Sequence, residues 1–160
     1  MSMYGVNASI PKTLIRWMIA AIADSEEFAP AKAVLEDILD TPISPELLPP
    51  DESGKISQYT EDLVGPYALH DFFLYYMLRF GFAPRKIFTL ACRAFEGDFD
   101  RETVQKWLKA FYRRFFTQQF KRSCLPDGVK VGSVCLSPRG DWRMPSDAVG
   151  RIWLQEVEQL

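Results

Sequence analysis

The clearest structural signal in the chain is the stretch 100–119, which reads DRETVQKWLKAFYRRFFTQQ. Its apolar residues recur at spacings of three and four, which predicts an amphipathic α-helix. The side chains expected to face inward are Val104, Trp107, Leu108, Phe111 and Phe115, and those expected to face outward are Lys106, Lys109 and Arg113. Asp100 precedes the first turn, where a carboxylate accepts from exposed backbone N–H groups, so we predict that it caps the helix.

The same periodicity predicts further helices on both sides of this one. They are expected at about 11–23, at 30–39, at 68–80, from Pro84 onward and after Ser146. Gly81 suits the left-handed end of the third of these. We therefore expect a mainly α-helical fold of about six helices joined by long irregular loops.

For several of these helices the sequence also predicts which residues are buried or cap the helix. The first has apolar residues around its circumference and is expected to be largely buried. The helix that begins at Pro84 is expected to turn Ile87, Leu90, Ala91 and Ala94 inward. In the last helix, Ser146 is the expected cap, and Val149, Ile152 and Trp153 are the expected apolar stripe. Residues 129–136 are the one candidate for a short strand.

Two segments read as irregular loops within a single unit of 160 residues. Residues 41–67 hold five prolines and two glycines, and residues 123–145 begin with the turn signal Pro126-Asp127-Gly128. Loops of such length in a compact domain are uncommon and are usually functional. Ligand contacts are therefore expected first in 41–67.

Composition excludes several classes of protein. With 48% hydrophobic residues, 25% charged residues and a net charge of −2, the chain is expected to fold. It has no apolar run long enough to span a membrane and no signal-like N-terminus, so we expect a cytoplasmic protein. The three cysteines, Cys92, Cys124 and Cys135, form no CxxC motif and are expected to be reduced thiols.

Charge is unevenly distributed along the chain. Residues 24–62 hold eleven acidic and two basic side chains, whereas residues 101–151 hold eleven basic and four acidic ones. Two oppositely charged regions of this kind attract each other, which is the slightly favoured interpretation. The alternative is a basic cleft that concentrates a phosphorylated ligand.

Self-sufficient catalytic machinery is not evident. A nucleophile–histidine mechanism would need His70, the only histidine, which lies among aromatic residues and is expected to be structural. The sequence has no zinc-ligand spacing and no glycine-rich phosphate loop. We therefore expect neither a catalytic residue nor a metal site in this chain.

Two polar segments are candidates for binding. Lys121 and Arg122 could hold a phosphate or carboxylate, or could complement a helix dipole. Arg139, Asp141 and Arg143 flank Trp142 in a segment bounded by prolines, which is typical of a binding or interface loop. The alternative is that Arg139 and Asp141 simply pair with each other.

Five segments, in the same order, resemble the glutamine-dependent NAD⁺ synthetases, in which an amidase domain precedes a synthetase domain. They are YGVNASIPKTLI at 4–15, TPISPEL at 41–47, residues 58–67, residues 119–123 and residues 137–147. The resemblance spans nearly the whole chain. It implies the C-terminal part of an adenine-nucleotide α-hydrolase-like α/β synthetase domain, lacking most of the parallel sheet.

The resemblance also implies a reaction and an ATP site. In the family, ATP and Mg²⁺ adenylate the nicotinate carboxylate of deamido-NAD, and ammonia then displaces AMP. Lys12 matches the family lysine that contacts the ATP phosphates. Ser44 matches a position that is often threonine and contacts ATP, and it retains the hydroxyl.

Further matches concern the dinucleotide. Thr60 and Glu61 fall in a loop that orders over bound substrate in relatives. Lys121 matches a lysine that contacts deamido-NAD, and Phe120 stands where the ammonia-only relatives have histidine. These residues are the candidate flap and the candidate deamido-NAD contacts.

Parts of the family pattern are absent from this sequence. The pyrophosphate-binding loop, the metal-binding carboxylates and the amidase domain all lie upstream in relatives. We therefore expect a fragment that is inactive alone, exposes apolar surface and self-associates, and that acts in a homodimer or higher oligomer. The alternative is a free-standing helical module that binds RNA, another anion or a protein, although the net charge of −2 disfavours nucleic acid.

Overall fold

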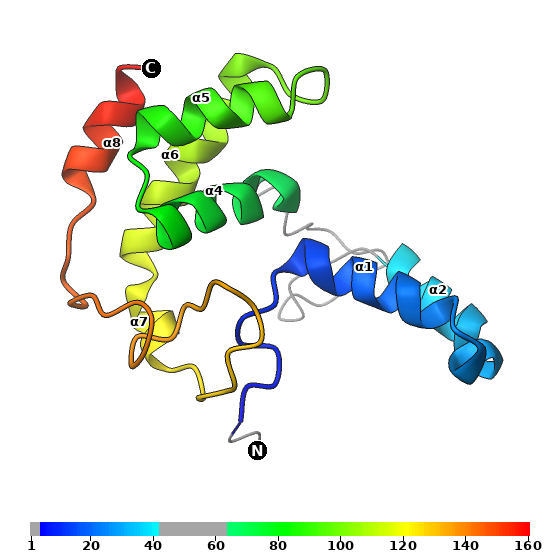
Figure 1. Ribbon diagram of the computed structural model, residues 1–160. Helices are drawn as coiled ribbons and strands as arrows, with labels where there is room; N and C mark the ends of the chain where they lie inside the picture. Colours follow the sequence, from blue (N-terminus) through cyan, green and yellow to red (C-terminus); the bar gives the residue numbers. More distant parts are fainter. Residues whose placement is uncertain (1–3, 42–63) are drawn as a thin grey trace, which may run out of the picture. The chain divides into compact units, whose positions relative to one another are not determined.

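The computed structural model describes residues 4–41 and 64–160, and within these ranges the chain forms helices and loops but no strand (Figure 1). The helices are α1 (Lys12–Ala23), a 3₁₀ helix (Glu26–Ala31), α2 (Lys32–Asp40), α4 (Tyr67–Phe80), α5 (Pro84–Ala94), α6 (Arg101–Thr117), α7 (Gln119–Ser123) and α8 (Arg151–Glu158). The expected mainly α-helical class is confirmed. No helix in the described ranges has both the length and the apolarity needed to cross a membrane.

The chain divides into two compact units. The core unit comprises Met1–Ile10 and Ala68–Leu160, and the hairpin unit comprises Pro11–Tyr67. Each is described by itself below.

The core unit is organised around α6, which packs against both α5 and α8. Val104, Leu108, Phe111 and Phe115 are buried as predicted. Tyr112 and Phe116 are buried as well, which the single-face pattern did not predict. The buried arc of α6 is wider than one face because the helix has neighbours on more than one side.

Aromatic contacts join α4 to α6 and extend the same core. The Phe73 ring centroid lies 5.7 Å from that of Phe111, and Leu69 and Met77 are buried on the same side of α4. In α5, Ile87 and Ala91 face inward as expected. The expectation for Ala94 is wrong, since it is exposed at the last helical position.

Two predicted helix ends of the core unit, the start of α6 and the end of α4, are confirmed. The Thr103 N–H donates to the Asp100 carboxylate at 2.7 Å, which holds the pKa of Asp100 below its usual value. Gly81 follows α4 with a φ of +65°, a conformation that costs glycine little.

The last helix differs from the prediction. It begins at Arg151 after Gly150, not near Ser146, and its buried residue is Val157. Val149 and Ile152 are 76% and 73% exposed, so the expected apolar stripe is wrong. Gly150 lies so close to Phe116 that a Cβ there would stand 2.4 Å from the ring, which places the start of α8 directly against α6.

Polar contacts fix α8 on the core. Glu156 accepts from the Arg85 backbone N–H at 2.9 Å, at the first turn of α5. Gln105 donates to the Val157 carbonyl at 2.9 Å, and Lys109 pairs with Glu158 at 2.7 Å. One of the three outward cations predicted on α6 is therefore held by α8.

The hairpin unit buries little. Its helices α1 and α2 pack on each other, and Lys32 pairs with Asp24 at 2.8 Å, which raises the pKa of Lys32 and lowers that of Asp24. Ala23 is the one buried side chain that α1 contributes, and Trp17 is 74% exposed. The expectation that this first helix is largely buried is wrong, because α2 covers only part of its apolar circumference.

Candidate functional site

The N-terminal segment 4–9 of the core unit lies along the loop that follows α7. The Gly5 N–H donates to the Asp127 carbonyl at 2.7 Å. Ser9 is buried, and its Oγ accepts from the N–H groups of Val131 and Gly132 at 2.7 and 2.9 Å. The loop thus finds partners in this segment, which is why the short strand considered for 129–136 does not form.

Two glycines of the loop permit this close approach. A Cβ on Gly128 would stand 1.8 Å from the Gly5 carbonyl oxygen, and one on Gly132 would stand 2.5 Å from the Ser9 carbonyl oxygen. Neither distance is compatible with a side chain. The seating of segment 4–9 therefore depends on glycine at both positions.

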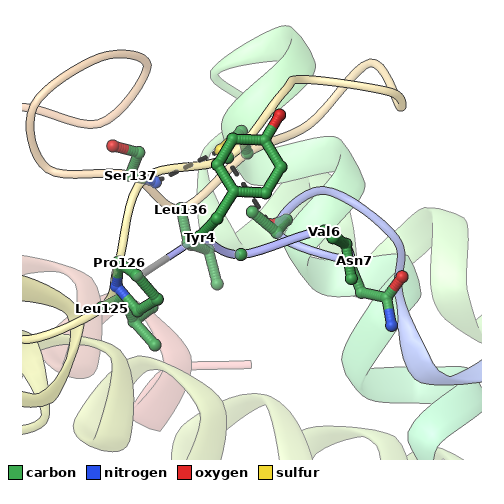
Figure 2. A pocket seen from close by; sticks show the side chains of 11 residues that line it. Tyr4, Val6, Asn7, Leu125, Pro126, Leu136 and Ser137 are labelled. Carbon is green, nitrogen blue, oxygen red and sulfur yellow. Dashed lines mark hydrogen bonds between the residues drawn. The ribbon is translucent and has the colours of Figure 1, made fainter. Parts of the chain in front are cut away.

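A cavity of about 390 Å³ lies between segment 4–9 and this loop (Figure 2). Side chains that line it include Tyr4, Val6, Leu125, Pro126, Leu136 and Ser137. No charged residue lines it. Its volume falls in the range of about 300–1,000 Å³ that is typical of small-molecule sites.

Cation–anion pairs hold the loop around the cavity. Arg139 pairs with Asp127 at 2.7 Å and also donates to the carbonyls of Ser123 and Leu125. Asp141 pairs with Lys130 at 2.7 Å. The alternative that Arg139 and Asp141 pair with each other is therefore wrong. Arg143 donates to the Arg139 carbonyl at 3.3 Å.

A buried polar cluster fixes α7 on the core beside this loop. The Arg122 guanidinium donates to the Gln119 side-chain oxygen and to the Phe115 carbonyl, and it lies 4.2 Å from the centre of the Phe115 ring. Burial lowers the pKa of Arg122. Gln119 donates in turn to the Met144 carbonyl at 3.1 Å. Arg122 is thus committed to internal contacts.

All three cysteines are free thiols, as expected. Cys135 is buried at the cavity, where its Sγ donates to the Ala8 carbonyl at 3.9 Å and accepts from the Ser137 N–H at 3.4 Å. Cys92 lies on α5, and burial raises the pKa of its thiol.

His70 is packed edge-on against Phe111, with ring centroids 5.3 Å apart. Burial lowers its pKa and so favours the neutral ring. Over 4–41 and 64–160 no group of three or more His, Cys, Asp or Glu side chains is arranged to hold a metal ion.

The predicted binding residues fall in different parts of the chain. Lys12 is exposed at the first residue of α1, in the hairpin unit. Phe120, which is 58% exposed, and Lys121, also exposed, lie on α7 in the core unit. Neither lysine forms an ion pair with another residue that the structure describes.

Three further predicted residues, Ser44, Thr60 and Glu61, lie outside the described residues, as does most of the proposed flap at 41–67. A pocket shared by Lys12, Ser44 and Lys121 therefore stays a prediction.

Sequence reasoning did not find the cavity or the role of Ser9. The turn signal Pro126-Asp127-Gly128 correctly indicated a break after α7. It gave no indication that a segment more than 120 residues away would supply the hydrogen-bond partners. The useful signal was glycine at 128 and 132, which marks places where another backbone approaches closely.

The described fold is similar to one part of a larger solved structure. It is similar to a crystal structure titled as a glutamine-dependent NAD(+) synthetase from Cytophaga hutchinsonii, with a TM-score of 0.67 and 18% sequence identity. The match covers 98% of this chain and 22% of that one. At this identity the similarity concerns the fold alone.

Sequence similarity is closer to enzymes of the same name. The chain is 44% identical over 181 aligned residues to the glutamine-dependent NAD(+) synthetase of Mycobacterium leprae (strain TN), and 42% identical over 178 to that of Mycobacterium bovis. Each match covers 99% of this chain and 26% of the relative. The chain is thus homologous to part of the glutamine-dependent NAD⁺ synthetases and spans about a quarter of their length. No family model matches it.

Proposed function

We propose that this chain supplies the C-terminal helical part of the synthetase domain of a glutamine-dependent NAD⁺ synthetase. The observation that carries the proposal is 44% identity across 99% of the chain to an enzyme of that name. The proposed enzyme is a carbon–nitrogen ligase of the cytoplasm. In it, the remaining synthetase and amidase regions complete the site, and two or more copies assemble.

The proposed reaction converts deamido-NAD to NAD⁺ at the expense of ATP. A nicotinate carboxylate oxygen attacks the α-phosphorus of ATP, and pyrophosphate leaves. Ammonia then attacks the carbonyl carbon of the acyl-adenylate, AMP leaves with the bonding electrons, and the amide forms. Activation is needed because a free carboxylate is a poor acyl donor.

Lys12 and Lys121 supply cations to the two substrates in this proposal. Lys12 stands at the first turn of α1, where its charge and the exposed N–H groups of the helix both favour an ATP phosphate. Lys121, with Phe120 beside it, would contact deamido-NAD. Both lysines are exposed and form no ion pair in the described residues, so their charges are available.

The other expected contacts divide into two sets. Ser44 would contact ATP, and Thr60 and Glu61 would belong to the flap over bound substrate. Arg139, Asp141 and Arg143 would act through the loop that they hold, because Arg139 and Asp141 are already paired with Asp127 and Lys130.

Mg²⁺ accompanies ATP in the family that the sequence resembles. The described residues do not fit a site for it, since no cluster of three metal-ligating side chains is present in 4–41 and 64–160. We therefore assign no step of this chain to the ion.

A segment exchange tests the proposal. The homologous quarter of the Mycobacterium leprae synthetase is replaced by this chain, and NAD⁺ formation from deamido-NAD, ATP and glutamine is measured. We expect an active chimera and an inactive isolated chain. Lys12→Ala and Lys121→Ala are expected to lower kcat/KM by tenfold or more, whereas Lys106→Ala, which removes an exposed cation of α6 that lies over the Trp107 ring, is expected to change it less than threefold.

Two outcomes would contradict the proposal. One is a folded chimera that binds neither substrate and makes no NAD⁺. The other is turnover by the isolated chain that exceeds the turnover of its Lys12→Ala variant, which would make the chain an independent enzyme.

A further inference from the structure

The buried guanidinium of Arg122 is held only by neutral groups of the described residues. It donates to the Gln119 side-chain oxygen at 2.9 and 2.6 Å and to the Phe115 carbonyl, and it lies 4.2 Å from the centre of the Phe115 ring. None of the ion pairs formed within 4–41 and 64–160 includes it. A buried cation without an anionic partner is costly, and an apolar side chain of similar volume is often at least as stabilising in its place. Stability alone therefore does not account for an arginine here.

The contacts of Arg122 determine which face of α7 is buried. Gln119 and Arg122 are three residues apart, so they share one face of the helix, and both are buried. Phe120 and Lys121 lie between them in sequence and so occupy the opposite face, where both are exposed. A helix of five residues has little stability of its own, and α7 has no side-chain cap at its start. The contacts of the buried face therefore decide how Phe120 and Lys121 are presented.

The same cluster joins α7 to two other segments of the core unit. Phe115, which supplies the carbonyl and the ring, belongs to α6. The Gln119 amide donates to the Met144 carbonyl at 3.1 Å, in the loop that follows α7. The Trp142 ring of that loop packs against Phe115, with ring centroids 5.2 Å apart. The cluster thus fixes the orientation of α7 on the core, although α7 itself is short.

We propose that Arg122 is a positioning residue for deamido-NAD, which holds α7 so that Phe120 and Lys121 are presented to the dinucleotide. The proposal rests on the proposed function, which makes these two residues the deamido-NAD contacts. Arg122 acts through them, because its own side chain is buried in the cluster. Lysine cannot replace it, since the planar guanidinium reaches an amide oxygen and a backbone carbonyl at once, and a single ammonium on a flexible stem does not reproduce that fork.

Amide exchange of the 160-residue chain tests the positioning without any need for activity. Arg122→Met keeps an unbranched apolar side chain and removes every hydrogen bond of the guanidinium. The amides of Lys121 and Cys124, which donate to carbonyls in and next to α7, are expected to exchange about tenfold faster, whereas those of α5 and α8 stay within about twofold. Gln105→Met is the matched control, because Gln105 holds α8 by a hydrogen bond and does not contact α7. Unchanged exchange in α7, or equal acceleration throughout the core unit, would overturn the proposal.

Steady-state kinetics of the chimera tests whether the orientation of α7 serves the dinucleotide. Arg122→Met and Arg122→Lys are both expected to raise the KM for deamido-NAD about three- to tenfold and to leave the KM for ATP within about twofold. In a Lys121→Ala background, Arg122→Met is expected to add about twofold at most, because the side chain that it positions is already absent. Gln105→Met is expected to leave both KM values unchanged.

The outcomes separate this proposal from the proposed function. An active chimera in which Arg122→Met raises both KM values equally, or in which its effect multiplies with that of Lys121→Ala, would overturn the positioning role and leave the synthetase standing. A folded but inactive chimera would reject the proposed function and with it the role of Arg122 toward the dinucleotide, whatever the exchange of α7 shows.

Discussion

The two units of this chain bury their apolar side chains to very different extents. In the core unit, Leu69, Leu108 and Tyr112 are completely buried. In the hairpin unit, Ala23 is the one buried apolar side chain in the described residues, whereas Trp17 and Val34 are 74% and 62% exposed. The difference indicates that the core unit is stable by its own packing, while α1 and α2 present a surface that needs a partner.

The largest expected effect follows from a pair of identical substitutions, one in each unit. Leu108→Ala empties a fully buried position on α6 and is expected to cost about 2–5 kcal/mol of unfolding free energy. Leu14→Ala, at a 44% exposed position on α1, is expected to stay within about 1 kcal/mol. Urea denaturation measures both. Equal losses would show that the hairpin unit is as well packed as the core.

Substitutions at two glycines of the core unit test the contact between segment 4–9 and the loop that follows α7. Gly128→Ala places a Cβ against the Gly5 carbonyl and is expected to cost about 1–3 kcal/mol by displacing segment 4–9. Gly140→Ala is the control, since its nearest neighbouring atom would be 4.0 Å away. Amide exchange at Gly5 reports the displacement. A Gly128→Ala variant with an unchanged Gly5 exchange rate would show that the two backbones are not in contact.

The exposed face of the hairpin unit predicts self-association of the isolated chain. Trp17→Lys is expected to raise the dissociation constant about tenfold, because it replaces a large exposed apolar side chain with a charge. Val149→Lys makes the same change at a 76% exposed position of the core unit and is expected to have little effect. Sedimentation equilibrium measures both. A monomeric unaltered chain would contradict the prediction.

The smallest effect concerns the cap of α6. Asp100→Ala removes the acceptor of the Thr103 N–H, and a modest loss of stability is expected. Because the pKa of Asp100 is lowered in the fold, its contribution is full above the unfolded value near 3.8 and is lost as the pH falls through the lower folded value. Denaturation from pH 7 down to 2.5 should show the variant and the parent converging. A loss that is equal at all pH values, or one shared by Asp98→Ala, would exclude this cap.

Local signals predicted the helical class, the cap of α6 at Asp100 and the end of α4 at Gly81, because each of these features is encoded by neighbouring residues. Local signals did not predict the features that depend on contacts between segments far apart in the sequence. Gly150 meets Phe116 of another helix and sets the start of α8, and Ser9 serves a loop that lies more than 120 residues further along the chain. The cavity depends on exactly such a meeting and so could not be read from either segment alone.

Hydrogen exchange of the isolated chain and of the chimera tests the central claim most directly, namely that this chain holds one self-supporting unit and one that the rest of a synthetase covers. We expect amides of α4, α5 and α6 to be protected in both proteins, and those of α1 and α2 to be strongly protected only in the chimera. Equal protection of α1 and α2 in both proteins would contradict the claim.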